Sequence, residues 1–243
     1  MKNIFFLITA VMIAFSSWSQ KIPKKPKKAT TTTKKDVTKK KKVLVGIDIS
    51  EYQDDKIDWT KVKKDKHKVD FIILRSTMGD DRDDDKFRQR IGKVRAAGFI
   101  AGAYHYYDPN ELSAAQAANY IRRVKLQRGD FIPIVDIEVL SKIQSNKKLL
   151  TGLKNWLNVV KKHFGVKPMI YTSYDFYKAH LKKDFSGYPL WVAAYSIKKK
   201  GTKIVKNCEI LQFTEKVKID GITNPVDGDK MQRSKLKNLL LKK

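Results

Sequence analysis

The segment Pro133-Ile134-Val135-Asp136-Ile137-Glu138 is an apolar run that ends in two carboxylates one residue apart. Side chains of a β-strand alternate between the two faces of a sheet. Asp136 and Glu138 would therefore point the same way, roughly 6.5 to 7 Å apart along the strand. Two neighbouring acids at the end of a buried strand lower the stability of the fold, so such a pair is typical of a catalytic site. The segment predicts a buried strand with a candidate catalytic pair; the alternative is two solvated acids at the start of a loop.

Apolar, β-branched segments recur on both sides of this strand and alternate with helical patterns. The sequence predicts strands at residues 43–49, 71–74, 99–107, 132–137, 169–171, 190–195 and 208–213. It predicts a helical turn from residue 58 and helices at about 87–97, 113–126 and 147–163, with Gly98 and Gly165 as stops. Buried strands that alternate with helices imply a parallel sheet.

We therefore expect an α/β protein in which residues 43–243 form a single irregular (β/α) TIM-like barrel with mostly parallel strands. A perfect eightfold barrel is not expected, because the last strands have little helix between them. An open doubly wound sheet is the alternative, but no Gly-rich phosphate loop follows any strand.

The start of the chain differs from this pattern. Residues 1–19 read as a secretory signal peptide, with Lys2 before an apolar run over residues 4–15 that is too short for a comfortable membrane span. We expect cleavage and export to the periplasm or the cell exterior, with an uncleaved anchor as the alternative. Residues 20–42 form a Lys/Pro/Thr-rich tail that cannot bury enough apolar surface to fold.

Positive charge dominates the sequence, with 52 Lys+Arg against 25 Asp+Glu and a net charge of +27. Residues 21–42 alone hold eleven Lys and one Asp. This tail is either a spacer or a segment attracted to an anionic cell-wall or membrane surface. Nucleic acid is not an expected partner, because no aromatic residue interleaves with these lysines. Cys208 is the only cysteine, so we expect a buried structural thiol in a monomeric protein.

The active-site residues of barrel proteins lie at the carboxyl ends of the strands. In this sequence those ends, with one segment after the last expected strand, carry Asp48, Arg75, Tyr104, Tyr106, Asp136, Glu138, Tyr171, Trp191, Gln212 and Asp227. Aromatic rings stack on the apolar faces of sugars, and cleavage of a glycosidic bond needs a proton donor and a second carboxylate. The pattern predicts a protein that acts on a sugar polymer.

Five segments resemble, in order and spacing, the glycoside hydrolase family 25 lysozymes over about residues 43–230. They are Asp48-Ile49-Ser50-Glu51-Tyr52-Gln53, Gly102-Ala103-Tyr104-His105-Tyr106, Asp136-Ile137-Glu138, Leu190-Trp191-Val192-Ala193-Ala194-Tyr195 and Gln212-Phe213. The resemblance implies an irregular β/α barrel that needs no cofactor or metal. It also implies hydrolysis of the β-1,4 bond between N-acetylmuramic acid and N-acetylglucosamine in peptidoglycan.

The same resemblance implies roles for individual residues. Glu138 matches the family's proposed general acid, and Asp136 matches the acid two residues before it. Asp48 and Asp227 match the remaining carboxylates of the site. The substrate-binding positions would be Tyr104, Tyr106, Tyr171, Trp191, Gln212 and Arg75.

Two mechanisms stay open for the acid pair. Neighbouring carboxylates cannot all ionise easily, so one of them should keep its proton near neutral pH. The strand spacing is close to the roughly 6.5–9.5 Å of inverting enzymes. A 2-acetamido sugar also permits substrate assistance, in which Asp136 would orient the acetamide group.

The chain departs from the family pattern at three positions. Met78 stands where a Glu is common, Arg75 replaces a usual Lys, and Leu211 replaces the Trp usually found before Gln212. We expect these changes to alter the groove wall and the substrate preference while sparing the four acids.

Other residues that could take part in catalysis or metal binding have simpler explanations. His105 alternates with two groove tyrosines, so it should face the helices. An acidic run at residues 80–85 lacks the central Gly of a regular Ca²⁺ loop, so we expect it to be solvated.

The first hypothesis is a secreted muramidase that acts on peptidoglycan glycan strands. Two alternatives are a non-catalytic peptidoglycan-binding protein on the same barrel and a hexosaminidase that acts on chitin-like substrates. The sequence leaves open whether the enzyme remodels its own wall or attacks other cells.

Overall fold

The computed structural model describes residues 42–53, 56–195 and 207–242. The chain divides into two units, Met1–Lys39 and Lys40–Lys243, and every described residue belongs to the second. The predicted signal peptide at residues 1–19, and all of the predicted basic tail at residues 20–42 except Lys42, lie outside the described residues. In the described part of the chain, no helix combines the length and apolar character needed to cross a membrane.

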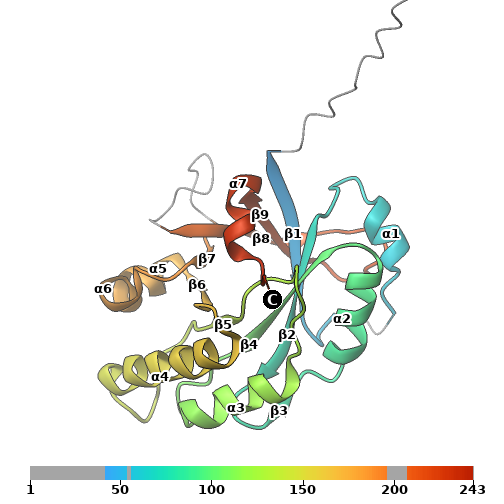
Figure 1. Cartoon of the computed structure of the whole chain (residues 1–243). Coiled ribbons are helices and arrows are strands. Elements are labelled where there is room, and N and C mark those ends of the chain that lie inside the picture. The colour runs from blue at the N-terminus through green and yellow to red at the C-terminus, as the bar shows by residue number, and fades with distance from the viewer. Residues whose placement is uncertain (1–41, 54–55, 196–206, 243) are drawn as a thin grey trace, which may run out of the picture. The chain divides into compact units, whose positions relative to one another are not determined.

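Eight strands close into a barrel, so the predicted fold class is confirmed (Figure 1). In ring order the strands are β1 (Val43–Ile49), β2 (Phe71–Met78), β4 (Ile100–Tyr106), β5 (Ile134–Asp136), β6 (Met169–Ser173), β7 (Leu190–Ala193), β8 (Cys208–Val217) and β9 (Val226–Gln232), which pairs again with β1. All neighbours are parallel except β9, which runs antiparallel to both β8 and β1. A short strand β3 (Arg82–Asp83) pairs with the end of β2 outside the ring.

Helices connect most of the strands on the outside of the barrel. They are α1 (Trp59–Lys64), α2 (Phe87–Ala96), α3 (Ser113–Arg123), α4 (Asn146–Phe164), α5 (Tyr174–Phe176), the π-helical turn η1 (Tyr177–Leu181), α6 (Lys182–Phe185) and α7 (Arg233–Leu239). The predicted helices are confirmed to within a few residues at their ends. The longest, α4, begins where the Ser145 hydroxyl accepts the Lys148 N–H and ends at Gly165, whose φ of +70° suits glycine.

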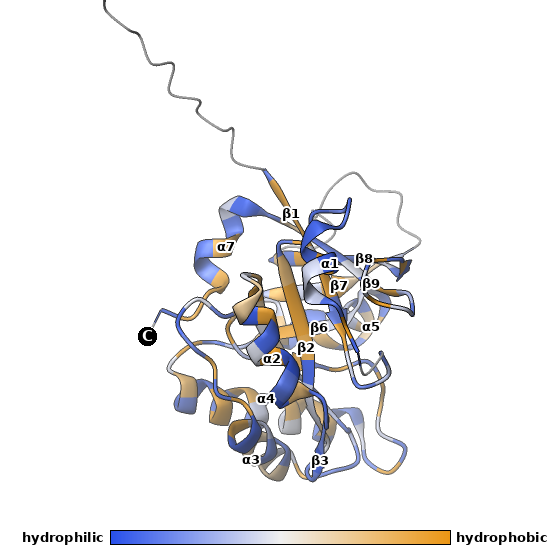
Figure 2. Cartoon of the chain, turned by 90° about the vertical axis from the view of Figure 1, so that its right-hand side faces the viewer, coloured by the Kyte–Doolittle hydropathy of each residue, from blue (hydrophilic) through white to orange (hydrophobic). Residues whose placement is uncertain are grey.

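Apolar side chains form one layer inside the barrel and another between the barrel and its helices. The inner layer includes Leu44, Phe71, Ile73, Phe131, Ile134, Met169, Trp191, Ile210, Met231 and Leu239. The alternation predicted for the acid-bearing strand is present, with Ile134 in the inner layer and Val135 and Ile137 in the outer one. Figure 2 shows the same division, with an apolar β2 at the centre and mixed polar faces on the helices.

The inner layer is tightly filled where β1 and β2 pair. A Cβ atom added to Gly46 would lie 2.0 Å from a ring carbon of Phe71, far inside van der Waals contact. The Phe71 ring fills the space above β1 and also makes an edge contact with Phe131, at 5.4 Å between centroids. Glycine at this position therefore lets a phenylalanine occupy the barrel interior.

The elements that were not predicted are the short strand β3, the α5–η1–α6 segment between β6 and β7, and the last two elements, β9 and α7. β9 carries Asp227, Asp229 and Lys230, so it lacks the apolar run of the other strands. α7 is rich in lysine, yet its Leu239 joins the inner apolar layer. In the fully described connection between β8 and β9 there is no helix, which confirms the expected irregularity of the barrel.

His105 and Cys208 lie as expected. His105 is fully buried on the helix side of β4, where it stacks on Trp156 of α4 and contacts Gln116 of α3. Burial lowers its pKa to about 4, so it is neutral at physiological pH. Cys208 is a buried free thiol whose pKa burial raises to about 12, which makes it a poor nucleophile.

Candidate active site

Eight of the ten predicted site residues surround one buried cavity of about 90 Å³ at the carboxyl ends of the parallel strands. They are Asp48, Tyr104, Asp136, Glu138, Tyr171, Trp191, Gln212 and Asp227. Because β9 is antiparallel, its first residues meet the last residues of β1, and Asp227 pairs in register with Asp48. The fold therefore assembles in one place side chains that lie up to 179 positions apart in the sequence (Asp48 to Asp227).

Asp136 and Glu138 form a hydrogen-bonded carboxyl pair at the end of β5. Asp136 is 4% exposed, whereas Glu138 lies beyond the strand end and is partly exposed. Burial and the neighbouring Glu138 raise the pKa of Asp136 well above its ordinary value. Burial also raises the pKa of Glu138, while the hydrogen bond from Asp136 opposes that rise. Both pKa values are raised, so the pair binds a proton more tightly than two separate carboxyl groups would.

A second acidic cluster joins Asp48, Asp227 and Asp229 on β1 and β9. Asp229 was not predicted, although it follows Asp227 by two residues, the same strand spacing that links Asp136 to Glu138. Burial raises the pKa of Asp48 strongly, of Asp229 to about 8 and of Asp227 to about 6. At neutral pH Asp229 therefore keeps its proton, and Asp48 binds a proton more tightly than a free aspartate does.

Amide and indole donors hold this second cluster in place. Gln212 donates from Nε2 to Oδ2 of Asp48 at 2.8 Å, and Trp191 donates from Nε1 to Oδ1 of Asp229 at 2.7 Å. The Oε1 of Gln212 accepts from the hydroxyls of Tyr171 and Tyr195, at 2.8 and 2.5 Å. Gln212 is thus the link between the acids and the tyrosines of the site.

Aromatic rings line the cavity around the acids. Trp191 makes edge contacts with Tyr171, at 4.5 Å between centroids, and with Tyr104, at 6.2 Å. Tyr106 is half-buried near Asp136 and Glu138, whose charges raise its pKa after burial itself. Trp191 is 1% exposed and Tyr171 is 7% exposed, so Tyr104 and Tyr106, which are half-buried, are the rings of this group that a sugar could contact.

Arg75 borders the site from β2 without lining the cavity. Its Nη2 lies 2.6 Å from Glu51, its Nε lies 3.6 Å from Asp84, and its guanidinium stacks over the exposed ring of Tyr52. The charge of Arg75 also lowers the pKa of Asp136. Arg75 therefore holds the loop after β1 and acts on the acid pair electrostatically.

Two expectations from the sequence are wrong. Asp84 of the acidic run is 3% exposed rather than solvated, because it accepts the Glu51 N–H at 2.7 Å and faces Arg75. Leu211 lies between Ile210 and Gln212, which both face the barrel interior, so its side chain points away from the groove. The change at Leu211 therefore does not alter the groove wall.

A second, more open cavity of about 330 Å³ lies beside the buried one. Its lining residues are Glu138, Ser173, Tyr174, Asp175, Ala193, Ala194 and Tyr195. Glu138 is the residue that borders both cavities. In the part of the chain that the structure describes, no group of three or more His, Cys, Asp or Glu side chains is placed to hold a metal ion.

Known proteins share both the sequence pattern and the fold. The sequence pattern of "Glycosyl hydrolases family 25" matches residues 47–222. The uncharacterized protein YegX of Escherichia coli (strain K12) is 33% identical over 185 residues, which cover 75% of this chain and 67% of YegX. The autolytic lysozyme of Clostridium acetobutylicum is 24% identical over 184 residues, which cover 76% of this chain and 54% of that protein.

The crystal structure of the bacterial lysozyme from Streptomyces coelicolor has the same fold, with a TM-score of 0.70 at 22% identity over 79% of this chain and 94% of that one. The matched family pattern covers seven of the eight barrel strands, from within β1 through β8, and includes Asp48, Asp136 and Glu138. The chain therefore belongs to glycosyl hydrolase family 25.

Proposed function

We propose that this protein is a lysozyme that hydrolyses the β-1,4 bond between N-acetylmuramic acid and N-acetylglucosamine in peptidoglycan. The observation that carries the proposal is the position of Glu138 at the boundary of the buried and the open cavity. A glycan strand that crosses this boundary would bring a glycosidic oxygen to a carboxyl group whose pKa burial raises. The two lysozymes similar to this chain support peptidoglycan as the substrate.

Glu138 is the proposed general acid because it is the accessible member of the acid pair. Its carboxyl group donates a proton to the glycosidic oxygen as the bond from that oxygen to the anomeric carbon breaks. Asp136 is almost fully buried, so it reaches only the part of a sugar that enters the inner cavity. The two roles are therefore assigned from how deeply each carboxyl group is buried, and not from its pKa alone.

Substrate assistance is the mechanism that the pair favours. An inverting enzyme needs a water molecule between carboxyl groups roughly 6.5–9.5 Å apart, and a hydrogen bond between Asp136 and Glu138 leaves no such gap. Asp136 would instead orient the 2-acetamido group, whose carbonyl oxygen attacks the anomeric carbon and forms a cyclic intermediate. A water molecule then attacks the same carbon and gives its proton to Glu138, which restores the acid.

The second acidic cluster would stabilise the positive charge that develops on the sugar. Asp227 has a pKa of about 6, so above that pH it is mostly ionised and faces the same cavity. Asp48, whose pKa burial raises, accepts a hydrogen bond from Gln212. We also propose that the protein is exported, since residues 1–19 read as a signal peptide and peptidoglycan lies outside the cytoplasm.

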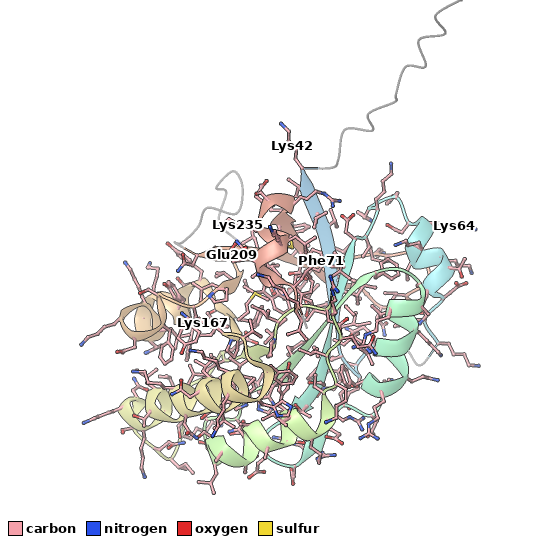
Figure 3. All side chains as sticks on the ribbon, viewed as in Figure 1. Lys42, Lys64, Phe71, Lys167, Glu209 and Lys235 are labelled. Carbon is pink, nitrogen blue, oxygen red and sulfur yellow. The ribbon has the colours of Figure 1, made fainter. Side chains whose placement is uncertain are left out.

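Replacement of Glu138 by Gln tests the proposal. Purified sacculi should release reducing ends with the unchanged protein and none with Glu138→Gln, while both keep the same unfolding midpoint. The control is Glu209→Gln, which makes the same chemical change near α7, where Glu209 pairs with Lys235 at 3.1 Å (Figure 3). Activity retained by Glu138→Gln, or lost equally by Glu209→Gln, would contradict the assignment.

A further inference from the structure

Lysines between the start of α4 and the end of α6 are not neutralised. Residues 146–185 hold nine Lys, two Asp and no Arg or Glu, a net charge of +7. Seven of these lysines, all except Lys167 and Lys178, are exposed and make no side-chain hydrogen bond, ion pair or ring contact with any described residue. Figure 3 shows long side chains projecting outward from this flank of the barrel.

The helices α2 and α3, nearer the start of the chain, have a different electrostatic character. Several arginines there pair with carboxylates, as in the Arg95–Asp130 pair at 2.5 Å and the Arg122–Asp83 pair at 2.7 Å. The α2–α3 flank therefore contains arginine–carboxylate pairs, whereas the seven lysines of the α4–α6 flank leave their ammonium groups open to an external anion.

A groove of about 460 Å³ lies on this flank between α4 and the η1–α6 segment. Lys147, Lys154 and Lys183 stand along it, and Leu150 and Phe185 give it an apolar base. Lys147 and Lys154 are seven residues apart, so they project from the same side of α4 about 10.5 Å apart along its axis. His180 also lines the groove, and Asp184 is the one acid among its lining residues. An extended chain with anionic groups and small apolar groups would fit such a lining.

The groove lies close to the open part of the active site. Tyr174 and Asp175 of α5 line the open cavity, and α5 continues directly into η1, which carries His180 into the groove. Figure 1 shows α4 beside α5 and α6 on one flank of the barrel. The open cavity and the groove are therefore joined by one continuous helical segment, which a side branch of a polymer bound at the catalytic acids would cross to enter the groove.

We infer that the groove between α4 and α6 binds the acidic peptide stems of peptidoglycan through Lys147, Lys154 and Lys183. This inference rests on the proposed function. Neutral sugars have no anionic group that could pair with the lysine ammonium groups. The peptide stems that branch from the glycan carry free carboxylates and alanine methyl groups. Lysine ammonium groups would pair with the carboxylates, and the apolar base would contact the methyl groups.

The test compares two charge-reversal variants of equal charge change in the full chain with Glu138→Gln, so that binding is measured without cleavage. Lys147→Glu, Lys154→Glu and Lys183→Glu together should weaken binding to purified sacculi about tenfold at low salt and little at high salt. The control reverses Lys64 at the end of α1, Lys66 just after it and Lys93 of α2, which are also exposed. It should weaken binding much less.

Stem-free glycan strands, made by amidase treatment of the same sacculi, distinguish binding to the stems from binding to other anions. On these strands the groove variant and its parent should bind equally. Equal effects of the two triple variants on sacculi, or a groove effect that persists on stem-free strands, would overturn the inference. Failure of the unsubstituted protein to cleave sacculi would instead contradict the proposed function, so the two failures are distinguishable.

Discussion

Replacement of Asp229 by Asn should make the stability of this protein less sensitive to pH. Asp229 is fully buried in the barrel, where it accepts a hydrogen bond from Trp191, and burial raises its pKa to about 8. In an unfolded chain an aspartate titrates near pH 4, so the folded protein binds an extra proton between about pH 4 and pH 8. Stability is therefore highest below this window and falls as the pH rises through it.

The size of the effect follows from the width of the window. Within it, each pH unit lowers the free energy of unfolding by about 1.4 kcal/mol for one proton. Between pH 4 and pH 7 the wild-type protein should thus lose about 4 kcal/mol that the Asp229→Asn variant keeps. Asparagine has nearly the same shape and can still accept the Trp191 N–H, so the packing change adds only a constant offset.

Urea unfolding followed by tryptophan fluorescence, at several pH values from 4 to 8, measures this difference. The matched control is Asp227→Asn, because the pKa of Asp227 is about 6 and its difference from wild type should stop growing near that pH. A difference between Asp229→Asn and wild type that does not change with pH would refute the reasoning, since it would mean that Asp229 is ionised in the folded protein.

Three further changes test other parts of the structure. Gly46→Ala should lower the free energy of unfolding by about 1–3 kcal/mol, because its Cβ would overlap the Phe71 ring; Gly92→Ala, in open space on α2, should raise it by about 0.5–1 kcal/mol in the same urea titrations. Arg75→Met should lower the free energy of unfolding by about 3–5 kcal/mol, because it leaves the buried Asp84 without its cation. It should also shift the pH profile of sacculus hydrolysis to higher pH, because the charge of Arg75 lowers the pKa of Asp136. An unchanged profile would show that Arg75 does not act on the acid pair. Deletion of residues 20–42 should weaken sedimentation with sacculi or anionic vesicles at low salt and not at high salt, whereas equal binding would leave the tail as a spacer.

The sequence predicts most of the barrel because its strands are continuous apolar runs. Val43–Ile49 and Phe71–Met78 have no polar interruption of the alternation until the site itself, and Gly165 marks the end of the longest helix. β9 escapes prediction for a physical reason, since its inward positions carry Asp227 and Asp229 instead of apolar residues. A strand whose interior face is used for chemistry loses the pattern by which strands are recognised.

The site is predictable as a set of residues but not as a geometry. Strand alternation places Asp136 and Glu138 on one side, yet the strand ends at Asp136 and the two carboxyl groups turn toward each other. The hydrogen bond between them depends on side-chain rotation beyond the strand, which spacing along the chain does not determine. Asp229 shows the converse case, because the same spacing rule applied to Asp227 would have found it.

Mass spectrometry of the products released from purified sacculi tests the central proposal most directly. Hydrolysis as proposed creates N-acetylmuramic acid at every new reducing end, and substrate assistance gives that sugar first in the β configuration. Products with these ends from the unchanged protein, and none from Glu138→Gln, are the expected result. New reducing ends on N-acetylglucosamine, or intact sacculi after prolonged incubation with the unchanged protein, would contradict the assignment of this barrel as a muramidase.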